Sequence, residues 1–240
     1  MNKSLSEIIK NRKSVRAYLN KPVSNDLIKE MLSKASQAPS GGNLQPWEIY
    51  VINDKSMEDF LNFQKNWKGV EEPPYPIYPE KLKEPYRTSR NQMGEEMYSL
   101  LGIKREDKLG RMNQMLKNFD FFGAPTGLFC FVDKQMGLPQ WSDLGMFLQT
   151  FMLLAVDSDL DTCAQESWSL KQNCVKTFLS APDDSILFCG MAIGYADKNS
   201  KINELMFLST HCLFIHDVKV LKSVRFSISQ IKKGIIHSLV

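Results

Sequence analysis

Two arginines and a serine stand at alternate positions near the start of the sequence, as Arg12, Ser14 and Arg16. Residues two apart in an extended segment point the same way, so this spacing offers two cations and a hydroxyl to one anion. A phosphate monoester suits that set of groups. The alternative is a solvated basic helix end stabilised by its dipole, and the spacing is compatible with both interpretations.

A second polar cluster occupies residues 38–47, where Ser40, Asn43 and Gln45 surround two consecutive glycines. Hydroxyl and amide groups both donate and accept hydrogen bonds, and glycine lets the backbone approach a flat ligand closely. A heteroaromatic ring edged with carbonyls and nitrogens needs such groups. An ordinary helix-to-strand turn accounts for the proline and glycines, but not for Asn43 and Gln45.

A third polar segment, residues 164–168, reads Ala-Gln-Glu-Ser-Trp and lies between two predicted helices. Loops in such positions often carry ligand contacts. However, Ser167 also has the residue type of a helix N-cap, so this segment taken alone favours neither reading.

Composition excludes several functional classes. Thirty Lys and Arg against 27 Asp and Glu leave a formal charge of +3, far from the basic balance typical of nucleic-acid binding. The three histidines are His211, His216 and His237, so no histidine triad or histidine zinc site is expected earlier in the chain. Chemistry in the body of the protein must then depend on another group, such as a bound cofactor.

Hydropathy and cysteine usage indicate a cytoplasmic protein with no membrane partner. The longest uncharged run covers residues 144–156, whereas a membrane span needs roughly twenty apolar residues. The first ten residues are interrupted by charges and lack the apolar stretch of a secretory signal. Five cysteines without a C-x-x-C pair are interpreted as reduced, mostly buried thiols.

Periodicity predicts helices interleaved with a few strands. Ser4 and Glu7 form a capping box for a first helix that carries Leu5, Ile8 and Ile9 inward, and Ser24 caps a second. Further helices are expected from residue 56, across 89–122, and at 142–156 and 170–179, with strands at 47–52, 126–132 and 186–195. The helix at 142–156 is apolar nearly all round and must be enclosed, while the Pro- and Tyr-rich residues 67–86 form an extended surface segment and candidate lid.

The three polar segments, in this order, resemble the nitroreductase-like family of FMN-dependent oxidoreductases. An R-x-S-x-R type motif at 12–16 precedes P-S-x-x-N-x-Q-P-W at 39–47, the most specific part of the likeness. It extends through 121–125, 141–145, 164–168 and 189–197, and so covers roughly residues 5–205. The likeness is closest to members that act on nitroaromatic acids such as nitrobenzoates.

The resemblance implies an α+β fold with a mixed central sheet flanked by helices, and an intertwined homodimer with two FMN sites at the subunit interface. Four residues would hold the phosphate and ribityl chain: Arg12, Lys13, Ser14 and Arg16. The partner subunit would contribute Pro39, Ser40, Asn43 and Gln45 to the same flavin. The ring edge would be lined by Ala164, Gln165, Glu166 and Ser167, with the backbone N–H of Glu166 near flavin N5.

The implied activity is reduction of small electron-poor acceptors such as nitroaromatics, with NADH or NADPH as donor, in a ping-pong mechanism without a catalytic side chain. The Pro- and Tyr-rich residues 73–86 are expected to help shape the acceptor pocket. Two alternatives stay open: a flavoprotein of the same family acting on quinones, activated alkenes or halogenated aromatics, and a non-catalytic flavin-binding protein.

The likeness ends at Leu205. Where the family carries an arginine that contacts the flavin phosphate, this sequence has Met206. We therefore predict an FMN-binding domain at residues 1–205 and a divergent tail at 206–240. Loss of one charged phosphate contact, worth about 1.5 to 3 kcal/mol, would weaken FMN binding some ten- to hundredfold.

Overall fold

The computed structural model describes residues 3–206. Residues Met1–Leu205 form one compact unit, and a second unit begins at Met206. Predictions about the tail and its histidines lie outside the described residues. The helices and strands, in chain order, are α1 (Leu5–Asn11), α2 (Asn25–Ala35), η1 (Gly41–Asn43), β1 (Glu48–Asn53), α3 (Asp54–Asn66), α4 (Tyr86–Leu100), α5 (Lys108–Leu116), η2 (Lys117–Gly123), β2 (Thr126–Asp133), α6 (Leu138–Asp157), β3 (Asp161–Gln165), η3 (Glu166–Lys171), α7 (Gln172–Leu179), β4 (Ser185–Gly194) and η4 (Lys201–Glu204).

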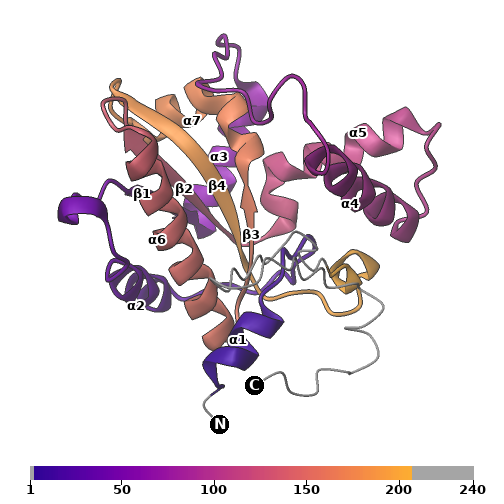
Figure 1. The fold of residues 1–240 in the computed structure, drawn as a ribbon, viewed down its shortest axis with the longest axis horizontal. Coiled ribbons are helices and arrows are strands. Elements are labelled where there is room, and N and C mark those ends of the chain that lie inside the picture. Colours follow the sequence, from indigo (N-terminus) through magenta and orange to yellow (C-terminus); the bar gives the residue numbers. More distant parts are fainter. Residues whose placement is uncertain (1–2, 207–240) are drawn as a thin grey trace, which may run out of the picture. The chain divides into compact units, whose positions relative to one another are not determined.

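Four strands form one sheet in the order β1-β2-β4-β3, and every neighbouring pair is antiparallel. The α+β class is confirmed. The expected mixed sheet is not found among the described strands, whose parallel pairing is limited to an isolated bridge between Ser14 and Thr162. Helices cover both faces of the sheet (Figure 1), so its central strands β2 and β4 are apolar on both sides and lack the alternation that usually marks antiparallel strands.

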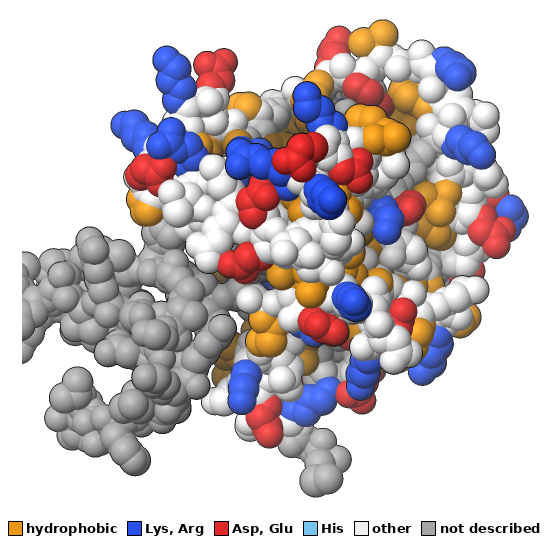
Figure 2. Space-filling view, turned by 90° about the vertical axis from the view of Figure 1, so that its right-hand side faces the viewer, with side chains coloured by type: hydrophobic (Ala, Val, Ile, Leu, Met, Phe, Trp, Pro, Cys, Tyr) orange, Lys and Arg blue, Asp and Glu red, His pale blue; other side chains and the backbone are white. Residues whose placement is uncertain are grey.

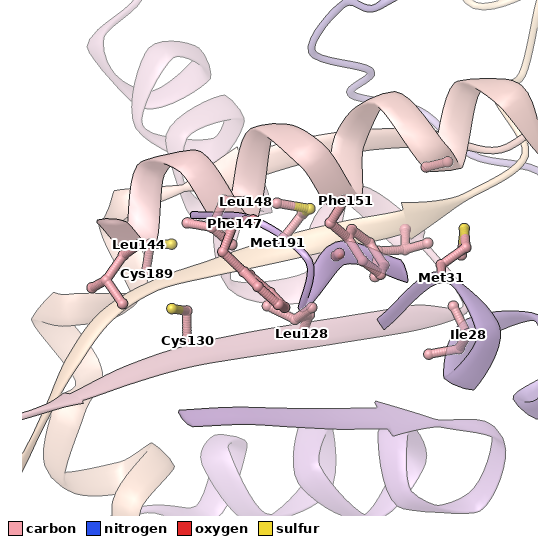
Figure 3. Close-up of a cluster of buried hydrophobic side chains, with 14 of the residues drawn as sticks. Ile28, Met31, Leu128, Cys130, Leu144, Phe147, Leu148, Phe151, Cys189 and Met191 are labelled. Atoms are coloured by element: carbon pink, nitrogen blue, oxygen red, sulfur yellow. The ribbon is translucent and has the colours of Figure 1, made fainter. Parts of the chain in front are cut away.

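One face of the sheet packs against α6 and α2. Leu128 and Cys130 of β2, and Met191 of β4, contact Phe147 and Phe151 of α6 in a fully buried cluster (Figure 3). Each of these side chains is at most 2% exposed, which explains the apolar sequence of α6. The prediction that this helix is enclosed is confirmed on the face that it turns to the sheet.

The opposite face of the sheet carries an aromatic cluster centred on Trp168, which is 0% exposed. Its ring lies 4.6 Å from that of Phe121 and 5.2 Å from that of Phe129, measured between centroids. A Cβ atom at Gly190 would stand 2.2 Å from Cδ1 of Trp168. Glycine in β4 therefore allows the indole to lie directly on the sheet.

The first helix begins as the sequence predicts, because the Ser4 side chain accepts from the Glu7 N–H while the Glu7 carboxylate accepts from Ser4. Its apolar face is only partly buried: Ile8 is 9% exposed, but Leu5 and Ile9 are 65% and 55% exposed. The prediction that all three point inward is wrong within one chain. Only the side of α1 that carries Ile8 packs against the rest of the chain, so Leu5 and Ile9 stay exposed.

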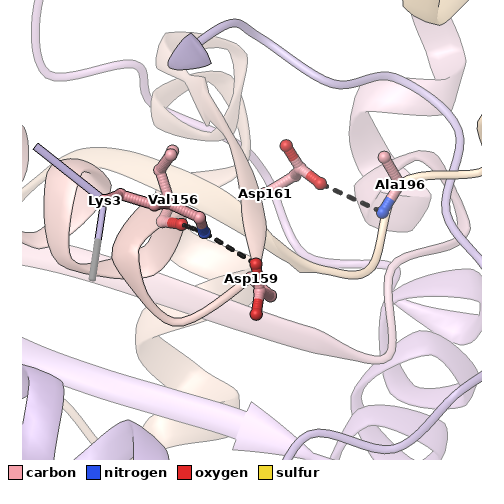
Figure 4. A network of polar contacts seen from close by, with 5 residues as sticks. All are labelled: Lys3, Val156, Asp159, Asp161 and Ala196. Carbon is pink, nitrogen blue, oxygen red and sulfur yellow. Dashed lines mark hydrogen bonds and ion pairs between the residues drawn. The ribbon is translucent and has the colours of Figure 1, made fainter. Parts of the chain in front are cut away.

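Polar contacts fix the start of α1 and the loop before β3 (Figure 4). The ammonium of Lys3 lies 2.6 Å from a carboxylate oxygen of Asp159 and also donates to the carbonyl of Val156. The carboxylate of Asp161 accepts from the N–H of Ala196 at 3.2 Å. The bonds of Lys3 hold the N-terminal residues at the end of α6, and the bond of Asp161 joins the start of β3 to the residues that follow β4.

Residues 67–85 contain no helix or strand, as the sequence predicts, but hydrogen bonds join them to the rest of the chain. The carboxylate of Glu71 accepts from the backbone N–H groups of Asn173 and Cys174, at 2.9 and 3.2 Å, at the start of α7. The hydroxyl of Tyr75 donates to the carbonyl of Phe188. The first half of this segment is thus bonded to α7 and β4.

The described residues contain no helix with the length and apolarity that crossing a bilayer requires.

Candidate functional site

A cavity of about 560 Å³ opens between the turn that follows β3 and the helices α4 and α5. Ligand pockets typically have this size. Its lining includes Arg16, Phe122 and residues 164–167, together with side chains of α4, α5 and the preceding segment. Three parts of the chain that are far apart in sequence therefore meet around one space.

The segment after α1 is extended and runs beside β3. The N–H of Val15 donates to the carbonyl of Thr162 at 3.0 Å, and Val15 is fully buried. In extended backbone its neighbours Ser14 and Arg16 point the other way. The cations of Arg16 and Arg12 and the hydroxyl of Ser14 all oppose the burial that raises the pKa of the Cys163 thiol. Ser14 and Arg16 therefore share one side of the segment, whereas binding of one phosphate by Arg12, Ser14 and Arg16 stays a prediction.

A buried amide that the sequence analysis did not single out holds this segment. Asn203, 4% exposed, accepts from the N–H of Arg16 at 2.8 Å and donates to the carbonyl of Ala17 at 2.8 Å and of Asp197 at 2.9 Å. Its own carbonyl accepts from the ammonium of Lys13. Lys13 therefore braces the segment, and of Arg12, Lys13, Ser14 and Arg16 it is Arg16 that lines the cavity.

The turn after β3 is fixed by the side chain of Gln165, which is 2% exposed. Its amide donates to the carbonyl of Asn118 at 2.7 Å and accepts from the indole N–H of Trp168 at 3.3 Å. Because these bonds hold the side chain of Gln165 inside the protein, it is the backbone of Gln165 that is available to a ligand. Glu166 keeps much of its surface open at the wall, yet the surrounding protein raises its pKa by desolvation.

The far wall of the cavity comes from α4 and α5 and carries paired and unpaired polar groups. Arg111 bonds both carboxylate oxygens of Glu95 at 2.9 Å, and its guanidinium lies 4.2 Å from the ring centre of Tyr98. Arg90 lies 4.3 Å over the ring of Tyr78. Methionines at 93, 97 and 115 fill the space between them, which gives the wall an apolar and aromatic character.

The polar loop around Ser40 lies elsewhere, beside α6 and α2 and away from α4 and α5 (Figure 1). The carboxylate of Asp143, 4% exposed, accepts from the N–H of Gly41 at 3.2 Å. Asn43 and Gln45 adopt positive φ values of 58° and 50°, a region that costs a non-glycine residue roughly 1–2 kcal/mol. Within the single chain, Pro39, Ser40, Asn43 and Gln45 do not reach the cavity.

The described groups fit a phosphorylated ligand with a flat, polar-edged ring. The guanidinium of Arg16 lines one side of the cavity, where it would bind a phosphate. The backbone of residues 164–167 forms the adjoining wall. On the opposite wall Gln114 is only 5% exposed, and its amide has no hydrogen-bond partner among residues 3–206. Because Gln114 lines the cavity, its amide is available to a molecule bound there.

Comparison with known proteins agrees with this geometry. The model of the nitroreductase family matches residues 9–195. The chain belongs to the nitroreductase family. A nitrobenzene nitroreductase of Ectopseudomonas oleovorans is 34% identical over 221 residues, which cover 89% of this chain and 97% of the relative. A 4-nitrobenzoate reductase of Pseudomonas putida is 38% identical over 201 residues, which cover 82% and 88%.

A solved structure gives the same family relation in three dimensions. The FMN- and NADPH-dependent nitroreductase NfnB from Sphigopyxis sp. strain HMH superposes with a TM-score of 0.82 at 39% sequence identity. The match covers 87% of this nitroreductase-family chain and 96% of the NfnB chain. The fold predicted from the polar motifs is therefore confirmed.

Several residues of the site carry no signal that sequence reasoning used. Asn203 and Asn118 act through contacts with residues more than 40 positions away, and isolated asparagines are common in loops. Arg90 and Gln114 lie within the helical region that was interpreted only by its apolar periodicity. Met93, Met97 and Met115 belong to that periodic pattern and line the cavity, so part of the apolar face of these helices faces the cavity.

Proposed function

We propose that this chain is an FMN-dependent nitroreductase that uses NADH or NADPH to reduce small nitroaromatic acceptors. The observation that carries the proposal is the cavity in which Arg16 meets residues 164–167. The FMN- and NADPH-dependent NfnB, at 39% identity over nearly its whole length, supports the choice of cofactor. When bound, FMN supplies the two-electron chemistry between nucleotide and acceptor.

The protein's part in this reaction is to bind and orient. Arg12, Ser14 and Arg16 hold the phosphate, with Lys13 and Asn203 keeping their backbone in place. Gln165 fixes the turn so that the N–H of Glu166 is held at the ring edge. Apart from Glu166, the described lining offers no carboxylate that is free of a cation, which suits a reaction without a proton-transferring side chain.

We further propose that the site is completed by a second copy of the chain. The loop carrying Ser40 and Asn43 is exposed and held by α6, yet lies away from the cavity of its own chain. Leu5, Ile9 and Met146 expose 65%, 55% and 38% of their surface on α1 and α6. In this arrangement the loop of one protomer reaches the flavin held by the other.

The activity is tested on purified protein with its bound cofactor. Flavin absorbance bands should bleach with NADH or NADPH and return on adding 4-nitrobenzoate, with nitroaromatic-dependent oxidation faster than the rate with oxygen alone. A panel of quinones, activated alkenes and halogenated aromatics ranks the acceptors. Protein without flavin, or flavin that no nicotinamide nucleotide reduces, would exclude the proposal.

The shared site is tested by complementation. Arg16→Ala and Asn43→Ala should each lower flavin content, because each removes one side of both sites. Co-expressed chains that carry one change each form mixed dimers, in which one of the two sites has neither change. Recovery of flavin in the mixed dimer is expected, whereas no recovery would place both residues in a site within one chain.

We also propose a cytoplasmic location. The four described cysteines are free and buried, as is usual for proteins of a reducing compartment. Recovery of the activity in a secreted or membrane fraction of the native cells would contradict this.

A further inference from the structure

The cavity wall formed by α4 holds a cation that the cofactor site does not account for. Five charged side chains line the cavity: Arg16, Arg90, Glu95, Arg111 and Glu166. Arg111 and Glu95 neutralise each other through two hydrogen bonds of 2.9 Å. Arg16 belongs to the proposed phosphate cluster. Arg90, which is exposed, is thus the remaining cation of the lining and is free to bind an anion.

No carboxylate among residues 3–206 forms an ion pair with Arg90, although α4 offers a direct comparison. Arg87, nearly one turn earlier, pairs with Glu84 at 2.7 Å and does not line the cavity. Arg90 instead lies flat over Tyr78, with its central carbon 4.3 Å from the ring centre. Stacking occupies the face of a guanidinium and leaves its N–H edge free to bind a carboxylate or phosphate.

A second polar group in the same wall, the amide of Gln114, is available to a ligand. Gln114 is 5% exposed and lines the cavity, and its side chain has no hydrogen-bond partner in the described part of the chain. Around these two polar groups the wall is soft and apolar, with Met93, Met97 and Phe122. Such surfaces pack well against an aromatic ring.

We propose that this wall is the acceptor subsite and that it selects an arene bearing both a nitro group and a carboxylate. Arg90 binds the carboxylate through its free edge, and Gln114 donates an amide hydrogen to a polar substituent of the same ring. The inference rests on the proposed function, since it names the acceptor class of that site.

Selectivity of this kind depends on a single residue and not on a general positive field. Acidic and basic side chains are interspersed with hydrophobic ones over this side of the molecule (Figure 2). The remaining carboxylate of the lining, Glu166, lies on the turn after β3 and not on α4. The guanidinium of Arg90 is also suited to binding the 2′-phosphate of NADPH, and the test below distinguishes that phosphate from the carboxylate of an acceptor.

The test compares 4-nitrobenzoate with its neutral methyl ester in the flavin-loaded protein. Arg90→Gln should lower kcat/KM for 4-nitrobenzoate by about tenfold, the effect of losing one charge-assisted contact at a solvent-accessible site, with kcat/KM for the ester within twofold. Arg90→Lys should restore part of the preference. Arg87→Gln, which removes a paired guanidinium of the same helix, should leave both acceptors unchanged.

A binding measurement gives a readout apart from turnover. Calorimetric titration with benzoate, and with neutral benzamide, should show benzoate binding that Arg90→Gln weakens about tenfold, while benzamide is unaffected. Gln114→Leu should weaken both ligands.

Four outcomes decide the matter. Loss of the preference for the acid in Arg90→Gln, with the ester still reduced, supports the subsite. Equal reduction of acid and ester by both wild type and Arg90→Gln overturns it, while the proposed function stands. A raised KM for NADPH but not NADH in Arg90→Gln, without a change in acceptor preference, also overturns it in favour of the nucleotide phosphate. Reduction of neither acceptor removes the proposed function itself.

Discussion

The clamp made by Asn203 gives the sharpest test of how the phosphate cluster is positioned. Asn203→Ala removes three hydrogen bonds of 2.8 to 2.9 Å, to Arg16, Ala17 and Asp197. At a net value of about 1 kcal/mol each, the loss is about 3 kcal/mol. For a chain of this length, about 2–4 °C per kcal/mol corresponds to a fall in Tm of about 6–12 °C.

The assay is thermal unfolding, followed by circular dichroism, together with the flavin content of the purified protein. Flavin content should fall along with Tm, because the backbone of Arg16 loses its anchor. Asn203→Asp keeps an acceptor for the N–H of Arg16 and should lose less. Asn199→Ala, which changes an exposed asparagine in the loop just before η4, serves as the matched control. An unchanged Tm and full flavin content in Asn203→Ala would refute the clamp.

Three further changes test separate parts of the structure. Gly190→Ala puts a Cβ 2.2 Å from buried Trp168 and should lower the free energy of unfolding by about 1–3 kcal/mol. The control Gly137→Ala, whose nearest atoms are at 3.7 Å, should lower it by less than about 1 kcal/mol. Equal Tm values for the two variants would contradict the packing argument. Burial raises the pKa of Glu166 in the folded state, so the folded protein binds the proton more tightly and loses stability as pH rises above the ordinary value of 4.5. Glu166→Gln should therefore raise Tm at pH 7.5 and leave it unchanged near pH 4, and a larger gain at pH 4 would reverse the sign. Asp143→Leu should lower flavin content by freeing the Gly41 loop, while Asp143→Asn keeps an acceptor and should retain it; flavin measurements on the two variants check this.

The local elements follow from short patterns in the sequence. Ser4 with Glu7, and Ser24 before α2, are capping signals whose hydrogen bonds form in the structure. The apolar runs of β2 and β4 predict buried strands, and both are found. The resemblance implied a mixed sheet, whereas the four strands of the described residues are all antiparallel. Helices cover both faces of this sheet, so the continuous apolar sequence of β2 and β4 does not distinguish antiparallel from parallel strands.

The binding groups were predictable only where they cluster in sequence. The spacing of Arg12, Ser14 and Arg16, and the motif at residues 164–167, predicted the segments that we propose to bind FMN. Asn203, Gln114 and Arg90 become informative only through burial and missing or distant partners, which depend on tertiary contacts. The outward position of Leu5 and Ile9 likewise depends on what packs against the helix, and periodicity does not encode it.

The isolated bridge between Ser14 and Thr162 also fixes how far the basic segment lies from the turn after β3. Because the basic segment is registered on β3 at Thr162, Gln165 follows three strand residues further on, a length of roughly 10 Å. An extended strand does not stretch, so the number of residues sets the distance between the segment proposed to bind phosphate and the turn after β3. Inserting or deleting one residue between Thr162 and Gln165 would change that span and also turn the buried amide of Gln165 to the opposite face.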